Sequence, residues 1–170
     1  MLERDQVAEQ LRLEAIRFGA AAQVVEDDAL YPSVTRTSVY LGVELPGLML
    51  SEATIRINDR PPVIIELNES EAYALLQSGG LKRALRANLP PGAHSIHFSV
   101  KGKMNYAKGE EADFAMEESF DFDKAPRPTS ILLYATRTES IRGRPGRTYS
   151  EGVRSQPTLD ARVVREQPQR

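Results

Sequence analysis

The sequence predicts an all-β protein, an antiparallel Ig-like β-sandwich with an N-terminal amphipathic helix and a disordered C-terminal tail. Between residues 35 and 136, apolar and polar residues alternate in short runs, as in strands with one buried face. Turn residues separate about seven such runs at roughly 8 to 15 residues, the spacing typical of sandwiches. The strand–helix alternation of a nucleotide-binding sheet is missing.

The composition indicates one domain with an extension at each end. The chain has 170 residues, of which 41% are hydrophobic and 27% charged, and its net charge is -2. A domain usually contains roughly 100 to 200 residues. We therefore expect a helix and linker in residues 1–30, a sandwich in 31–137 and an Arg-rich tail in 138–170. The near-neutral charge argues against a dedicated nucleic-acid-binding protein, which would be basic.

The residue types exclude several kinds of chemistry. The chain has no cysteine, which excludes disulfides, thiolate metal sites, cysteine nucleophiles and iron–sulfur clusters. No run approaches the roughly 18 apolar residues of a membrane span. The first ten residues are too charged for a secretory signal. The protein is therefore either cytosolic or periplasmic with its signal removed. We expect no cofactor and no metal site.

The first predicted element is a helix from Leu2 to about Ala22. Its apolar positions Val7, Leu11, Ala15 and Phe18 follow at spacings of four, four and three, which gives a narrow apolar stripe. We expect such a stripe to lie on its own domain. A short stalk and a partner-binding helix are the alternatives. Val7, Leu11 and Phe18 are therefore candidate interaction residues.

The next elements are strands around one short helix. Alternation predicts strands in residues 35–45, 53–57 and 63–67. Asn68 and the acidic residues after it predict the start of a one- or two-turn helix, and Gly79-Gly80 its end. Residues 81–89 fit both a helix and a strand. Further strands are predicted at 93–103, 114–122 and 130–136. Glu118 interrupts an apolar row, which predicts a bulge or an end-of-sheet position near it.

The two histidines do not predict a metal site or an active site. His94 and His97 are three residues apart, so on a strand they face opposite sides and lie roughly 10 Å apart along the chain. We expect the His94 ring to bond to the preceding turn and His97 to lie in solvent. No nucleophile elbow accompanies them, so we expect no catalytic residues. The acidic residues between 110 and 123 are interpreted as a solvated, edge-protecting face.

Beyond Arg137 the periodicity is lost. Residues 137–170 contain eight arginines, four acidic residues and three prolines. This composition is typical of disorder, because it cannot bury enough surface to offset the ordering entropy. Arg142, Arg144 and Arg147 belong either to a solvated tail or to a peptide that binds a protein partner, and in the second case they are candidate interaction residues. A weaker alternative is a salt-dependent contact with nucleic acid or anionic lipid.

The motifs GGLKR at 79–83 and NLPPGAH at 88–94 carry the pattern GG-x-x-R followed by N-L-x-x-G-x-H and a strand. This pattern resembles a family of small proteobacterial envelope proteins, many of which carry an automatic label as AraC-type transcription regulators. The resemblance implies a secreted, non-catalytic β-sandwich, often encoded beside a large tetratricopeptide-repeat envelope protein. The regulator label conflicts with residues 35–136, because those DNA-binding domains are helical.

The favoured hypothesis is a non-catalytic protein-interaction module of the bacterial cell envelope, an accessory subunit located in the periplasm. Its expected partner is a larger, repeat-containing protein, and we expect no nucleic acid and no membrane span. The alternative is a carbohydrate- or cell-wall-binding sandwich, which would need exposed tyrosines, since the chain has no tryptophan. A hydrolase would require a cleft in which a histidine meets serine or aspartate.

Overall fold

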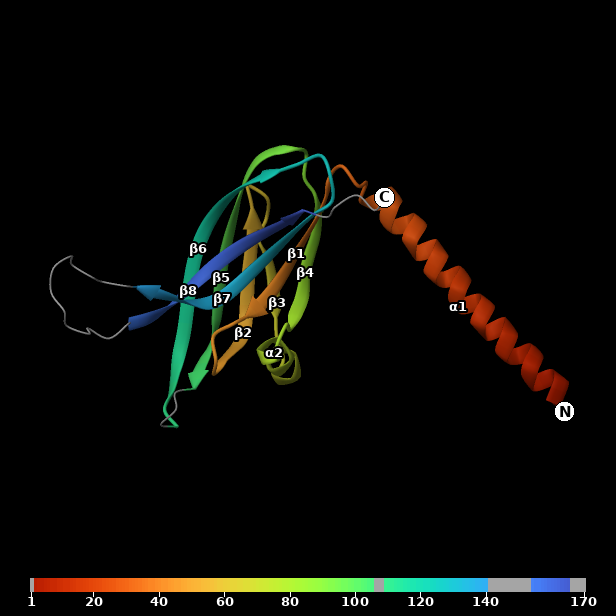
Figure 1. The fold of residues 1–170 in the computed structure, drawn as a ribbon, viewed down its shortest axis with the longest axis horizontal. Coiled ribbons are helices and arrows are strands. Elements are labelled where there is room, and N and C mark those ends of the chain that lie inside the picture. The colour runs from red at the N-terminus through yellow and green to blue at the C-terminus, as the bar shows by residue number, and fades with distance from the viewer. Residues whose placement is uncertain (1, 106–108, 141–153, 166–170) are drawn as a thin grey trace.

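Two four-stranded sheets pack face to face, with one helix beside them and a second that projects away (Figure 1). The computed structural model describes residues 2–105, 109–140 and 154–165. The helices are α1 (Leu2–Leu30) and α2 (Glu69–Leu76). The strands are β1 (Arg36–Val43), β2 (Leu48–Ile57), β3 (Val63–Glu66), β4 (Leu81–Asn88), β5 (Gly92–Asn105), β6 (Glu111–Lys124), β7 (Thr129–Ser140) and β8 (Arg154–Arg165). The predicted β-rich, two-sheet architecture is confirmed.

The sheets have the strand orders β4-β1-β7-β8 and β3-β2-β5-β6. Neighbouring strands run antiparallel with one exception, since β1 and β7 are parallel. The prediction of a purely antiparallel sandwich is therefore wrong for this pair. Parallel neighbours need a crossover connection, and here the chain between β1 and β7 passes through the whole of the second sheet.

The register identifies where the sheets bend. The β1–β4 ladder shifts at Val39/Tyr40, and the β2–β5 ladder shifts between Leu50 and Glu52. The β5–β6 ladder runs without a shift from Gly92 to Asn105. Of the two alternatives predicted near Glu118, the end-of-sheet position is confirmed and the bulge is not. Strand β6 is the edge strand of its sheet, and the Glu118 side chain reaches solvent without a change of register.

The core lies between the inner faces of the two sheets. Val39, Leu41, Ile55, Ile131 and Leu133 have no exposed surface. The alternation that predicted the strands also predicts this burial, since every second side chain points inward.

The predicted short helix is confirmed as α2, and it begins with a capping box. The Asn68 side chain accepts from the Glu71 amide at 2.9 Å, and the Glu71 carboxylate accepts from the Asn68 amide at 3.1 Å. The ambiguous segment after it is strand β4, which pairs with β1. The turn between them requires Gly80, because a Cβ there would lie 2.2 Å from the carbonyl oxygen of Ala74.

The disordered tail predicted for residues 138–170 is wrong for residues 154–165, which form β8. This strand pairs with β7 from Thr129↔Arg165 to Ser140↔Arg154, and its Leu159 is only 4% exposed. Alternating Leu159, Ala161 and Val163 form a strand pattern, which the surrounding Arg-rich composition conceals. Arg142, Arg144 and Arg147 lie outside the described residues.

The N-terminal helix extends to Leu30, past the predicted end near Ala22. It projects from the sandwich (Figure 1), and every side chain described in it is exposed. The expectation that its stripe lies on its own domain is therefore wrong. The two sheets already cover each other's inner faces, and the buried hydrophobic cluster contains no residue before Val39. In the described part of the chain, no helix is both long and apolar enough to cross a membrane.

Candidate functional site

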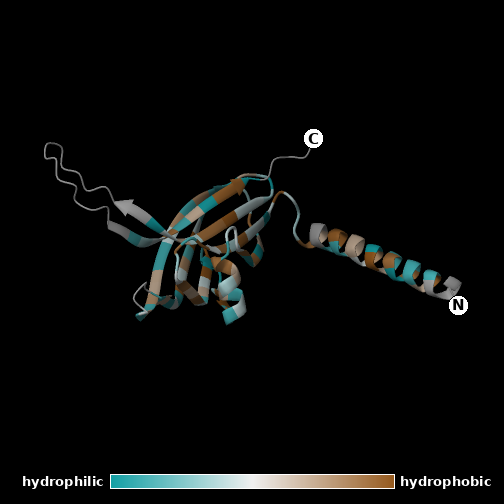
Figure 2. Ribbon diagram, turned by 60° about the horizontal axis from the view of Figure 1, so that its bottom comes forward, coloured by the Kyte–Doolittle hydropathy of each residue, from teal (hydrophilic) through white to brown (hydrophobic). Residues whose placement is uncertain are grey.

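More than half of the large apolar side chains that are exposed in the described residues lie on α1. The candidate residues Val7, Leu11 and Phe18 are 57%, 61% and 76% exposed. Hydrophobic and hydrophilic residues alternate along this helix, well apart from the sandwich (Figure 2). Further side chains on α1 are more than half exposed, namely Leu13, Ile16, Val24, Val25 and Leu30. So many large apolar side chains on one isolated element indicate an interaction surface.

The end of α1 is fixed to the sandwich at β4. The side-chain amide of Asn88 donates to the carbonyl oxygen of Leu30 at 2.7 Å. The hydroxyl of Thr35 donates to the Asn88 side chain at 3.1 Å. The Arg86 guanidinium lies 5.9 Å from the centre of the Tyr31 ring. These contacts hold the exit from the helix, whereas residues 6–26 are exposed to solvent.

A buried lysine holds the segment that follows α1. Lys124 is only 2% exposed, and its ammonium group donates to the carbonyl oxygens of Val34, Ala125 and Arg127. Burial lowers the pKa of Lys124, because a charged group loses hydration there. A buried amine with a lowered pKa can be a nucleophile. Here the three carbonyl bonds occupy its three protons, which indicates a structural role.

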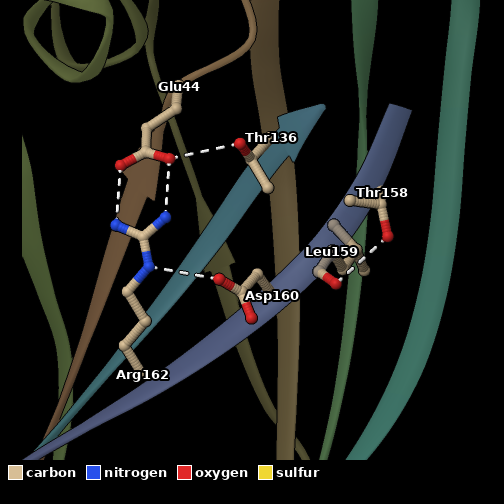
Figure 3. Close-up of polar contacts among 6 residues, drawn as sticks. All are labelled: Glu44, Thr136, Thr158, Leu159, Asp160 and Arg162. Carbon is tan, nitrogen blue, oxygen red and sulfur yellow. Dashed lines mark hydrogen bonds and ion pairs between the residues drawn. The ribbon is translucent and has the colours of Figure 1, made fainter. Parts of the chain in front are cut away.

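Strand β8 is fastened to the sheet by a polar cluster (Figure 3). Arg162 forms a bidentate ion pair with Glu44, with both N···O distances 2.8 Å, and its Nε donates to Asp160 at 3.1 Å. Thr136 on β7 donates to Glu44 at 3.1 Å. The Arg162 guanidinium also lies 4.4 Å from the centre of the Tyr134 ring. The cluster therefore joins the end of β1 to β7 and β8.

The electrostatics of this cluster favour the charged forms. The hydrogen bond from Arg162 lowers the pKa of the Glu44 carboxyl, and the hydroxyl of Thr136 acts in the same direction. The bond to Glu44 in turn raises the pKa of Arg162. Both side chains are partly exposed, and the arginine and carboxylates satisfy one another. The arrangement indicates a fastening of β8 and provides no reactive group.

The two histidines face different surroundings. His94 Nε2 lies 2.7 Å from the carbonyl oxygen of Pro90, and its Nδ1 lies 2.9 Å from the side-chain nitrogen of Asn58. The predicted bond from His94 to the preceding turn is thus confirmed. Among the described residues, no group of three or more histidine or acidic side chains is placed to hold a metal ion.

His97 is less exposed than the prediction of a solvent position implies. Its Nδ1 lies 3.0 Å from the hydroxyl of Ser119, and its Nε2 lies 3.8 Å from the Glu117 carboxylate. Sequence reasoning missed this contact, which the cross-strand register His97↔Ser119 creates. It differs from a catalytic triad, because the carboxylate is beyond hydrogen-bond reach and is three-quarters exposed.

A shallow depression of about 330 Å³ lies between α2 and the ends of β2, β5 and β6. Tyr73 is exposed beside it, and Lys103 in its wall pairs with Glu111 at 3.3 Å and Asp113 at 3.0 Å. A sugar platform would need a flat group of exposed aromatic rings. Tyr31, Tyr40 and Tyr134 are partly covered.

Comparisons of the chain with models of protein families, with curated proteins and with solved structures found no match.

Proposed function

We propose that this protein is a non-catalytic protein-interaction module of the bacterial cell envelope, an accessory subunit that binds a larger, repeat-containing partner through α1. The observation that carries the proposal is the exposed apolar surface of this helix. A buried Val, Leu, Ile or Phe side chain contributes about 1.5 to 3 kcal/mol relative to an exposed one. A partner that covers α1 would bury these side chains, and their burial would contribute to the free energy of binding.

The sandwich in this proposal acts as a support for the helix. Asn88 and Lys124 fix the segment between Leu30 and Arg36 to the sheets, so α1 has a defined point of departure. A helix-in-groove contact reads apolar side chains three and four positions apart. Leu13 and Ile16 on α1 have this spacing and are exposed.

Site-specific photo-cross-linking of the full chain in the bacterial envelope tests this proposal. A photoreactive residue at Ile16 is expected to cross-link to one predominant larger protein, and Leu13→Glu is expected to abolish the product. Ile64 on β3 is the matched control, because it is 61% exposed and Ile16 is 59% exposed. Equal products at the two positions, or none at Ile16, would overturn the proposal.

A second candidate function is binding of carbohydrate or cell wall at the depression beside Tyr73. One exposed aromatic ring next to Asn68, Asn105 and Glu69 provides a stacking face and polar groups. Sedimentation with peptidoglycan that is lost on Tyr73→Ala but retained on Ile16→Glu would favour this function. The converse pattern would favour binding through α1.

A further inference from the structure

The apolar residues of α1 follow a heptad repeat. Ala8, Ala15 and Ala22 form one row, seven residues apart, and Leu11, Phe18 and Val25 form a second row beside it. The steps between the rows alternate between three and four residues, which is the pattern of a coiled-coil seam. These six residues, here called the seam, are all exposed.

We propose that the seam pairs with the seam of a second copy of this chain, forming an antiparallel two-stranded coiled coil. The two rows differ in size, one being all alanine and the other Leu, Phe and Val. A parallel pair would stack alanine on alanine and phenylalanine on phenylalanine, which leaves voids in alternate layers. In an antiparallel pair, each layer contains one small and one large residue.

Of the registers that place small residues opposite large ones, one gives each of the six seam residues a partner within the seam. Ala8 faces Val25 of the second copy, Leu11 faces Ala22, and Ala15 faces Phe18, and the symmetry repeats these three layers. This register places residue 3 of one helix level with residue 30 of the other, so helices that span Leu2–Leu30 overlap along nearly their whole length. The two sandwiches then lie at opposite ends of the rod.

The contact area sets the expected strength of the dimer. The overlap of about 28 residues is about 42 Å long, and a footprint about 11 Å wide on each copy gives roughly 900 Å² in total. This area is at the low end for a specific interface. We therefore expect a dimer that dissociates on dilution.

The charges on α1 make an anionic membrane a poorer occupant of the seam. Helices that lie on such membranes carry many basic residues on the polar face. Among residues 6–26, Glu9, Glu14 and Glu26 outnumber Arg12 and Arg17. Leu13, Ile16 and Val24 lie outside the seam, so the dimer leaves them accessible, and this inference does not depend on the larger partner proposed above.

Sedimentation velocity of the full chain from about 1 to 200 µM tests the association. The wild type is expected to shift toward twice the chain mass of 18.9 kDa as concentration rises. Phe18→Glu is expected to remain monomeric at every concentration, because it places a charge against Ala15. Ile16→Glu is the matched control on the same helix outside the seam, and it is expected to dimerise like the wild type. An unchanged thermal unfolding transition of the sandwich verifies that both variants fold.

The orientation is measured with a single spin label. The chain has no cysteine, so Gln6→Cys on the outer side of α1 gives one labelling site per copy. The antiparallel register separates the two labels by about 31 Å along the helix axis, whereas a parallel pair holds them at the same level. Electron–electron distance measurement is expected to give the long separation.

Three results would overturn this inference: a wild type that is monomeric throughout the range, a dimer that survives Phe18→Glu, or two labels at the same level. A monomeric chain that still cross-links to a larger protein at position 16 would refute the dimer and leave the proposed function standing. A dimer with no cross-link at position 16 would do the reverse.

Discussion

The strongest test of the fold concerns Leu159 on β8, in a segment whose composition predicts disorder. Its side chain is 4% exposed and belongs to the hydrophobic core. Leu→Ala substitutions in a core cost about 2 to 5 kcal/mol. Because β8 is an edge strand that can partly collapse around the change, we expect Leu159→Ala to lower the free energy of unfolding by about 2 to 3 kcal/mol.

Urea unfolding monitored by circular dichroism measures this effect. With a slope of about 2 kcal/mol per molar urea, the midpoint should fall by roughly 1 to 1.5 M. Val163→Ala on the same face of β8 is the matched control. Val163 is 37% exposed, so its loss should cost only about 0.5 kcal/mol. Equal small shifts for the two variants would mean that β8 does not pack on the sandwich, and would refute the reasoning.

Three further substitutions test other contacts. Because the pKa of Glu44 is lowered, its contribution to stability is present above its ordinary pKa of 4.5 and is lost as pH falls through the lower folded value. Glu44→Gln should therefore flatten the acid side of a profile of stability against pH. An unchanged profile would contradict this. Lys124→Met leaves three carbonyl oxygens without their donor and should lower the free energy of unfolding by about 2 to 3 kcal/mol. A thermal midpoint equal to that of the wild type would show that the Lys124 hydrogen bonds do not hold the segment after α1. Gly42→Val should cost about 1 to 3 kcal/mol, because a Cβ there meets the Tyr134 ring at 2.3 Å; a double-mutant cycle with Tyr134→Ala should recover part of the loss, and full additivity would count against the contact.

The sequence predicted the elements that depend on hydrogen bonds between near neighbours or on the alternation of residues within one strand. The Asn68 cap identified the start of α2, and the alternation at Ile96, Phe98 and Val100 identified a buried face. These features depend on hydrogen bonds within one turn or on the period of a single strand. A sequence carries such information directly, because no distant residue has to be located first.

The features that could not be predicted depend on distant partners. The parallel pairing of β1 with β7 brings together residues about ninety positions apart, as in Thr37↔Thr129. The ion pair from Arg162 to Glu44 spans 118 positions. Arginine composition predicted disorder, but this arginine stabilises β8 through a carboxylate and an aromatic ring that only the fold places beside it. The exposure of α1 was unpredictable for the same reason, because nothing in the helix reveals that the core is complete without it.

The two ends of the described chain differ in what can hold them. A strand such as β8 can use the open backbone edge of β7, so hydrogen bonds along the ladder add to the burial of Leu159. A helix satisfies its backbone internally, so only burial of side chains can hold it in a fixed contact. Because α1 contributes nothing to the core, the stability of this helix must depend on its own helix propensity or on another chain that covers it. Helical circular dichroism that falls on dilution, while the strand signal persists, would show that another copy supplies this cover.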